Sequence, residues 1–145
     1  MVFKINISEK SGKTYKLEIE APALEGKELG SKIQGKDVSQ DLEGYELEIT
    51  GASDKSGITA MKNVDGVGLK KVLLNYGKAM HKKPKGEKKK GSKPKGLRMR
   101  KTVRGKIISP AISQINLKVL KEGGKKLEEI FKKEEAESKP EEKKE

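Results

Sequence analysis

All three arginines of this chain lie within residues 97–106, although lysine supplies the positive charge elsewhere. A guanidinium is a planar fork that can grip two phosphate oxygens or both acceptors of a guanine edge, whereas a lysine ammonium acts as a point charge. In an extended strand, Arg98, Arg100 and Arg104 would share one face. We therefore expect these three side chains to fix the position of a bound nucleic acid.

The positive charge of the chain is concentrated in residues 78–106. This segment holds fourteen Lys and Arg against one acid, Glu87, so its net charge is +13, whereas the whole chain carries +12. Such a block repels itself unless a polyanion neutralises it, which leaves nucleic acid or an anionic membrane surface as partners. A membrane-surface site would use an amphipathic basic helix, and glycines and prolines interrupt this run. RNA is therefore the favoured partner, and no membrane is expected.

We predict that residues 78–106 form an RNA-binding arm. A solubilising loop or a localisation signal is the alternative interpretation of the lysine run. The five aromatic residues fall mostly on predicted apolar faces, so contacts to the RNA backbone and shape are expected rather than aromatic stacking. The predicted RNA-binding residues are Lys82, Lys83, Lys85, Lys88, Lys89, Lys90, Lys93, Lys95, Arg98, Arg100, Lys101, Arg104 and Lys106. Possible additional contacts are Lys55, Lys62, Lys70 and Lys71.

Residues for catalysis or metal binding are not indicated by the sequence. There is no cysteine, and His81 stands among lysines without a second imidazole or thiol to share a metal. The spacing of Gly86 and Gly91 matches a phosphate-binding P-loop, but Ser92 stands where lysine is required. We predict no catalytic residue, metal, cofactor or small-molecule substrate. An RNA-processing enzyme is a lesser hypothesis, because its magnesium would need clustered carboxylates.

The pattern of apolar residues predicts an all-β fold. Apolar and polar residues alternate over residues 3–7, 15–19, 45–49 and 115–119, and shorter strands are expected at 72–74 and 102–108. Turn-forming residues 51–57 should end the third of these strands, and residues 21–41 should be loops with a short helical turn. The pattern predicts six or seven short strands without crossover helices. We therefore expect a small antiparallel, barrel-like domain that closes its own edges.

The remaining expectations concern organisation along the chain. The β-domain should span residues 1–123 with the basic arm, residues 78–106, as an excursion from it. Apolar residues spaced three and four apart predict a short amphipathic helix over 124–133, followed by a charged, disordered tail over 134–145. No apolar run approaches about 18 residues and the N-terminus lacks the layout of a secretory signal, so we expect a soluble, cytoplasmic protein.

Two motifs carry a resemblance to a known family. Residues 44–57 read GYELEITGASDKSG and residues 100–105 read RKTVRG, with Ile115-Asn116-Leu117 further on. These stretches resemble the S6e family of archaeal and eukaryotic small-subunit ribosomal proteins, over about residues 1–123. The resemblance implies a non-enzymatic structural component with a β-barrel-like domain, bound to small-subunit ribosomal RNA among neighbouring ribosomal proteins in the cytoplasmic ribosome. The short form looks archaeal.

An architectural DNA-binding protein that uses the same basic arm is the main alternative. Contacts to phosphates carry little sequence information, so the charge pattern alone does not separate DNA from RNA.

Overall fold

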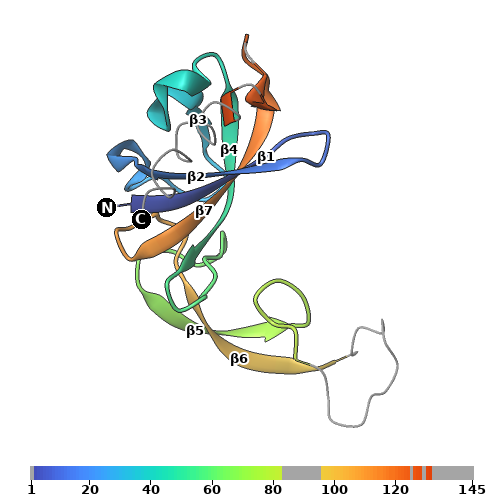
Figure 1. The fold of residues 1–145 in the computed structure, drawn as a ribbon. Coiled ribbons are helices and arrows are strands. Elements are labelled where there is room, and N and C mark those ends of the chain that lie inside the picture. The colour runs from blue at the N-terminus through green and yellow to red at the C-terminus, as the bar shows by residue number, and fades with distance from the viewer. Residues whose placement is uncertain (1, 83–95, 125, 129, 132–145) are drawn as a thin grey trace, which may run out of the picture.

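The computed structural model describes residues 2–82, 96–124, 126–128 and 130–131. Seven strands lie in this part of the chain, so the predicted number is confirmed. They are β1 (Val2–Ser8), β2 (Thr14–Glu20), β3 (Lys32–Gln34), β4 (Glu46–Asp54), β5 (Leu69–Asn75), β6 (Arg98–Arg104) and β7 (Ile112–Lys121). Three short 3-10 turns are η1 (Pro22–Leu24), η2 (Gly35–Asp37) and η3 (Gln40–Leu42). Figure 1 shows a curled sheet with a separate two-stranded ribbon, β5–β6, below it.

The main sheet has the strand order β2-β1-β7-β4-β3. Its pairs are antiparallel except β1–β7, which is parallel over Lys4↔Gln114 to Ser8↔Lys118. The expected all-β, barrel-like fold is confirmed in part, as a curled half-barrel sheet. It differs from the antiparallel barrel with closed edges in two respects: the β1–β7 pair is parallel, and among the described residues β2 and β3 are edge strands. A parallel pair normally needs a long crossover connection, and here the intervening strands β2 to β6 provide it in place of a helix.

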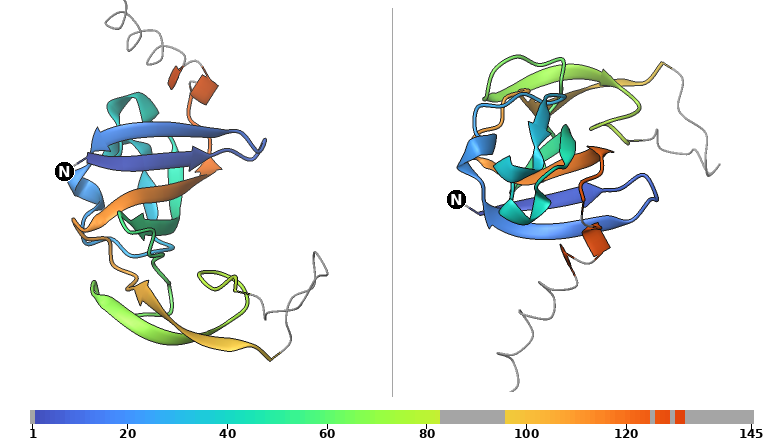
Figure 2. Two further views of the ribbon diagram at one scale, coloured as in Figure 1. Left: turned by 60° about the horizontal axis from the view of Figure 1, so that its bottom comes forward. Right: turned by 90° about the horizontal axis from the view of Figure 1, so that it is seen from above.

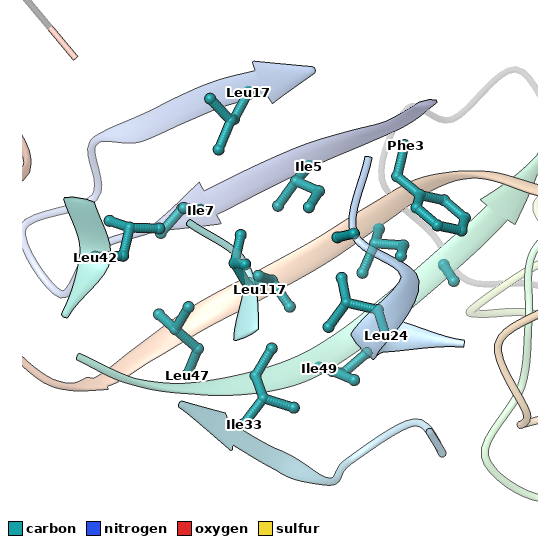
Figure 3. Close-up of a cluster of buried hydrophobic side chains, with 14 of the residues drawn as sticks. Phe3, Ile5, Ile7, Leu17, Leu24, Ile33, Leu42, Leu47, Ile49 and Leu117 are labelled. Carbon is teal, nitrogen blue, oxygen red and sulfur yellow. The ribbon is translucent and has the colours of Figure 1, made fainter. Parts of the chain in front are cut away.

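The alternating apolar residues form the core on the inner face of the curled sheet. Ile5, Ile7, Leu47, Ile49 and Leu117 have no exposed surface, as their period-two spacing predicts. Figure 3 shows these side chains pointing toward one another, with residues of the 3-10 turns closing the open side. Burial of this apolar surface is the main stabilising contribution to the domain.

The turn-forming residues after Ile49 do not end β4 where expected. β4 continues to Asp54 alongside β7, with register shifts between Ile49 and Gly51 and between Ser53 and Asp54. Such bulges allow β4 to include residues that fit a regular ladder poorly, because β7 continues to supply hydrogen bonds on either side of each bulge. The predicted turn therefore begins a few residues later than its composition indicated.

The apolar residues predicted for the C-terminal helix pack on this domain. Leu127, Ile130 and Phe131 are buried in the main core, and the Phe131 ring stacks on Tyr15 with centroids 4.9 Å apart. The helix over 124–133 lies only partly within the described residues, and the tail over 134–145 lies outside them, so both stay predictions.

The β5–β6 ribbon begins its second strand earlier than expected. A strand was predicted over 102–108, but β6 spans Arg98–Arg104 and pairs antiparallel with β5 from Asn75↔Arg98 to Leu69↔Arg104. Both Arg98 and Arg100 thus lie in a hydrogen-bonded ladder, because β5 supplies backbone partners that composition could not reveal. In both views of Figure 2 the ribbon lies apart from the five-stranded sheet.

Backbone contacts around the end of β6 join the ribbon to the segment between β4 and β5. The Met61 amide donates to the Arg104 carbonyl at 3.1 Å, and the Lys106 amide donates to the Val64 carbonyl at 2.8 Å. Gly105 is closely surrounded, because a Cβ at this position would lie 1.8 Å from the Gly66 carbonyl oxygen. Only glycine allows this approach of the two chain segments.

We expect Gly105→Ala to lower the free energy of unfolding by about 1–3 kcal/mol, because the new methyl group overpacks this junction. The matched control is Gly68→Ala, since a Cβ at Gly68 meets no atom within 4 Å. Urea unfolding followed by circular dichroism measures both variants. Equal stability of the two would contradict the steric account.

Candidate nucleic-acid interface

The cross-strand register of the ribbon places two of the three arginines on one exposed face. Arg98 lies opposite Asn75, Arg100 opposite Leu73, and Thr102 opposite Lys71. We call the face formed by these six residues the arginine face. Directly opposed residues in an antiparallel pair point to the same side, and all six are exposed. The other face, with Met99 and Val103, is more buried.

The arginine face contains no acidic residue, and its cations are unmatched within the described structure. Among residues 2–82 and 96–124, neither Arg98 nor Arg100 forms an ion pair. Unneutralised guanidinium groups on an exposed β-ribbon are suited to bind phosphate or a base edge.

Arg104 has a partner within the fold that the sequence did not indicate. Its Nε and Nη2 both donate to Oδ2 of Asp54, at 3.0 and 2.7 Å, and both side chains are only 13% exposed. The hydrogen bond from Arg104 is the main reason why the pKa of Asp54 lies below its ordinary value. The register places Arg104 on the predicted face, but its guanidinium binds Asp54 of β4. The pair therefore links the ribbon to the main sheet.

Lys106 also has internal partners. Its Nζ lies 3.1 Å from Oδ1 of Asp65 and 3.3 Å from Oε2 of Glu28, and these two carboxylates, Asp65 first, raise the pKa of Lys106. Lys106 therefore contributes to the junction between ribbon and sheet, like Arg104.

The possible additional contacts divide in the same way. Lys62 lies 3.5 Å from Glu48, and the Lys70 ammonium donates to the Asp65 backbone carbonyl at 2.8 Å. All four lysines are exposed, but Lys55 and Lys71 have no ion-pair partner among the described residues, and Lys71 lies on the arginine face. The structure therefore leaves only part of this lysine set without an internal partner.

The basic run is only partly described. Lys82 is exposed and Lys101 is partly buried on the ribbon. The following predicted contacts lie outside the described residues: Lys83, Lys85, Lys88, Lys89, Lys90, Lys93 and Lys95.

The start of the basic run is fixed to the folded domain. Met80 has no exposed surface, and the Gly77 amide donates to its carbonyl at 2.8 Å. The His81 ring meets Tyr76 edge-on, with centroids 6.1 Å apart. On the other side of the run, β6 begins at Arg98. Since Asn75 and Arg98 are paired, the chain segments before and after the run lie side by side in one ribbon.

Sequence reasoning missed two features of this site. Asp54, the partner of Arg104, lies 50 residues away in the chain, and no local pattern indicates their pairing. Leu73 was taken as part of a brief strand, but it is 53% exposed in the middle of the arginine face. Lys70 and Lys71, near the start of β5, could have signalled a solvent-facing strand.

Two further properties bear on the chemistry of this surface. Within the described residues, no three His, Cys, Asp or Glu side chains gather where they could hold a metal ion. The same part of the chain has no helix of the length and apolarity needed to cross a membrane.

We expect Asp54→Asn to destabilise the protein at neutral pH, because Arg104 loses its charged partner. The pKa of Asp54 is lowered from 3.8 by folding, so its stabilising contribution is present above that value and is lost as pH falls through the folded-state pKa. The stability difference between parent and variant should therefore shrink below about pH 3.8. Urea unfolding at a series of pH values measures this difference.

The control for this experiment is Asp41→Asn, which changes an exposed carboxylate that has no ion-pair partner among the described residues. It should alter stability little at any pH. A difference for Asp54→Asn that stays constant into the acid range would contradict the assigned role of the pair.

Comparison with known proteins gives a consistent family. The model of the family described as ribosomal protein S6e matches residues 3–132. A small ribosomal subunit protein eS6 from Methanococcus maripaludis is 42% identical over 124 residues, covering 85% of this chain and 90% of that protein. Its counterpart in Archaeoglobus fulgidus is 39% identical over 139 residues, covering 93% and 99%. The chain therefore belongs to the ribosomal protein S6e family.

Proposed function

We propose that this protein is a structural constituent of the small ribosomal subunit. In this role it binds small-subunit ribosomal RNA through residues 78–106 and the arginine face, beside neighbouring ribosomal proteins in the cytoplasmic ribosome. The RNA-binding part of this proposal rests on how the cations are distributed in the fold. Arg104 and Lys106 form ion pairs with acidic residues at the junction, whereas Arg98 and Arg100 lie on an exposed face that has no acidic residue.

The binding mechanism follows from that sorting. Lysines of the basic run would neutralise phosphates where RNA helices crowd together, which lets the helices pack. Arg98 and Arg100 sit on a paired strand, so their guanidinium groups start from fixed backbone positions and lose less freedom on binding. The lysines thus supply attraction and the two arginines supply position. The proposal needs no cofactor, metal or catalytic step.

Binding to small-subunit RNA should depend steeply on salt. If about six phosphates are engaged, the logarithm of the affinity should fall with the logarithm of salt concentration at a slope of about −4 to −5. Filter binding measures this slope, and duplex DNA added as competitor separates the RNA proposal from an architectural DNA-binding protein. A slope near zero, or stronger competition by DNA than by unlabelled small-subunit RNA, would refute the proposal.

The charge-preserving double variant Arg98→Lys, Arg100→Lys should lose preference for small-subunit RNA over a scrambled RNA while keeping most of its affinity for the scrambled one. The reason is that lysine keeps the charge but loses the planar fork. The Arg104→Lys variant is the matched comparison, because its side chain binds Asp54 in the fold. Arg104→Lys should lower thermal stability and leave RNA preference nearly unchanged below its melting temperature. The proposed roles would be contradicted if Arg104→Lys lost the RNA preference and the double variant lost only thermal stability.

A further inference from the structure

The arginine face exposes apolar surface in the middle of its cations. Leu73 is 53% exposed. Leu69, four residues earlier in β5 and on the same side of the strand, is 50% exposed. Only Val2 and Val67 are comparable among the large apolar side chains of the described residues. An exposed leucine at the centre of a cationic ribbon does nothing for phosphate binding. Because Leu73 lies among these cations, we expect the ligand of this face to have an apolar surface as well as negative charge.

The neighbours of Leu73 define what such a ligand must offer. Arg100 lies directly across the ribbon, and Arg98 and Asn75 form the adjacent cross-strand pair. Side chains in such positions have Cβ atoms about 4.5–5.5 Å apart, so the leucine methyl groups and two guanidinium groups lie within reach of one small ligand. Together they present an apolar platform, two positive forks and one amide that can both donate and accept.

A nucleotide matches this combination. A nucleobase has a flat, weakly polar face that can lie on Leu73, an edge that Asn75 or a guanidinium can hydrogen-bond, and an adjoining phosphate for the second guanidinium. The base must be unstacked, because a base inside a duplex has both faces covered. An acidic, apolar peptide would also match the charges, but the basic run enters β6 directly at Arg98. This continuity of cations favours the longer polyanion.

We propose that the arginine face holds one unstacked nucleobase of an RNA, flat on Leu73 and between Arg98 and Arg100. This inference rests on the proposed RNA-binding function and adds to it the form of RNA that is bound: a bulge, loop or unpaired end rather than continuous duplex. It also extends the sequence expectation of backbone and shape contacts, because a base can be held here without an aromatic side chain.

The structure offers a matched pair of variants. Leu73→Thr and Leu69→Thr each replace a half-exposed leucine on the same face of the same strand by a residue with high β propensity. They differ in the arginine opposite: Arg100 is exposed, whereas the Arg104 guanidinium is held by Asp54. Only Leu73 therefore has a free guanidinium across from it. Leu73→Ile keeps the apolar surface and serves as a rescue variant.

The probes are an RNA hairpin with a single bulged 2-aminopurine and the same hairpin fully paired. The parent protein should bind the bulged hairpin more tightly and change the fluorescence of the bulge. Leu73→Thr should weaken binding to the bulged hairpin by about 5–10-fold, at the low end of what one base contact contributes, with little change for the paired hairpin. Leu69→Thr and Leu73→Ile should bind both hairpins nearly as the parent does. Circular dichroism and thermal unfolding check that each variant is folded.

The outcomes distinguish this inference from the proposed function. Salt-dependent binding to small-subunit RNA together with equal affinity of the parent for both hairpins would overturn the nucleobase site and leave the ribosomal role standing. A loss for Leu73→Thr that is equal on both hairpins, or equal to that of Leu69→Thr, would also overturn it. Unchanged binding of RNA by Leu73→Thr with weaker incorporation into small subunits would assign the face to a protein neighbour instead. If the parent fails to bind small-subunit RNA at all, the proposed function itself falls.

Discussion

The ion pair between Arg104 and Asp54 connects the two sheets of this protein. It also separates the arginine that has an acidic partner in the fold from the two that lie exposed on the ribbon. Its two hydrogen bonds, at 3.0 and 2.7 Å, join the end of β6 to the end of β4 where both side chains are largely buried. Lys106, between Asp65 and Glu28, adds a second electrostatic contact beside it. The cations nearest the domain thus have acidic partners within the fold, whereas Arg98 and Arg100, farther out on the ribbon, have none among the described residues.

This arrangement gives the ribbon a defined place without a core of its own. A two-stranded ribbon is at best marginally stable alone in water. Here its base is held by the close approach at Gly105 and by amide-to-carbonyl bonds from Met61 and Lys106. The exposed arginines therefore stand on a strand whose geometry is set by the main domain. The backbone positions of these arginines are therefore fixed, unlike those of charged side chains on a flexible segment.

The sequence predicted the strands with one buried face and their inward residues, because alternation decides which side of a strand meets the core. Ile5, Leu47 and Leu117 lie inside as expected. Alternation carries no information about which strands are neighbours, so the parallel β1–β7 pair and the open edges at β2 and β3 were not predicted. The same limit applies to Arg104, whose interaction with Asp54 arises from tertiary contact across 50 residues. Arg98 and Arg100 could be placed on one face because a period of two suffices for that.

The parallel pairing of the first and last strands determines when the fold can be completed during synthesis. β1 and β2 form a local hairpin, but β7, which lies between β1 and β4, is the last strand to leave the ribosome. Contacts between residues so far apart in the chain form late and slowly. Residues 78–106 are therefore synthesised before the central strand of the main sheet, and the apolar faces of β1 and β4 have no shared neighbour during that interval. Because synthesis runs from the N-terminus, the basic segment of this protein is made before its fold can be completed.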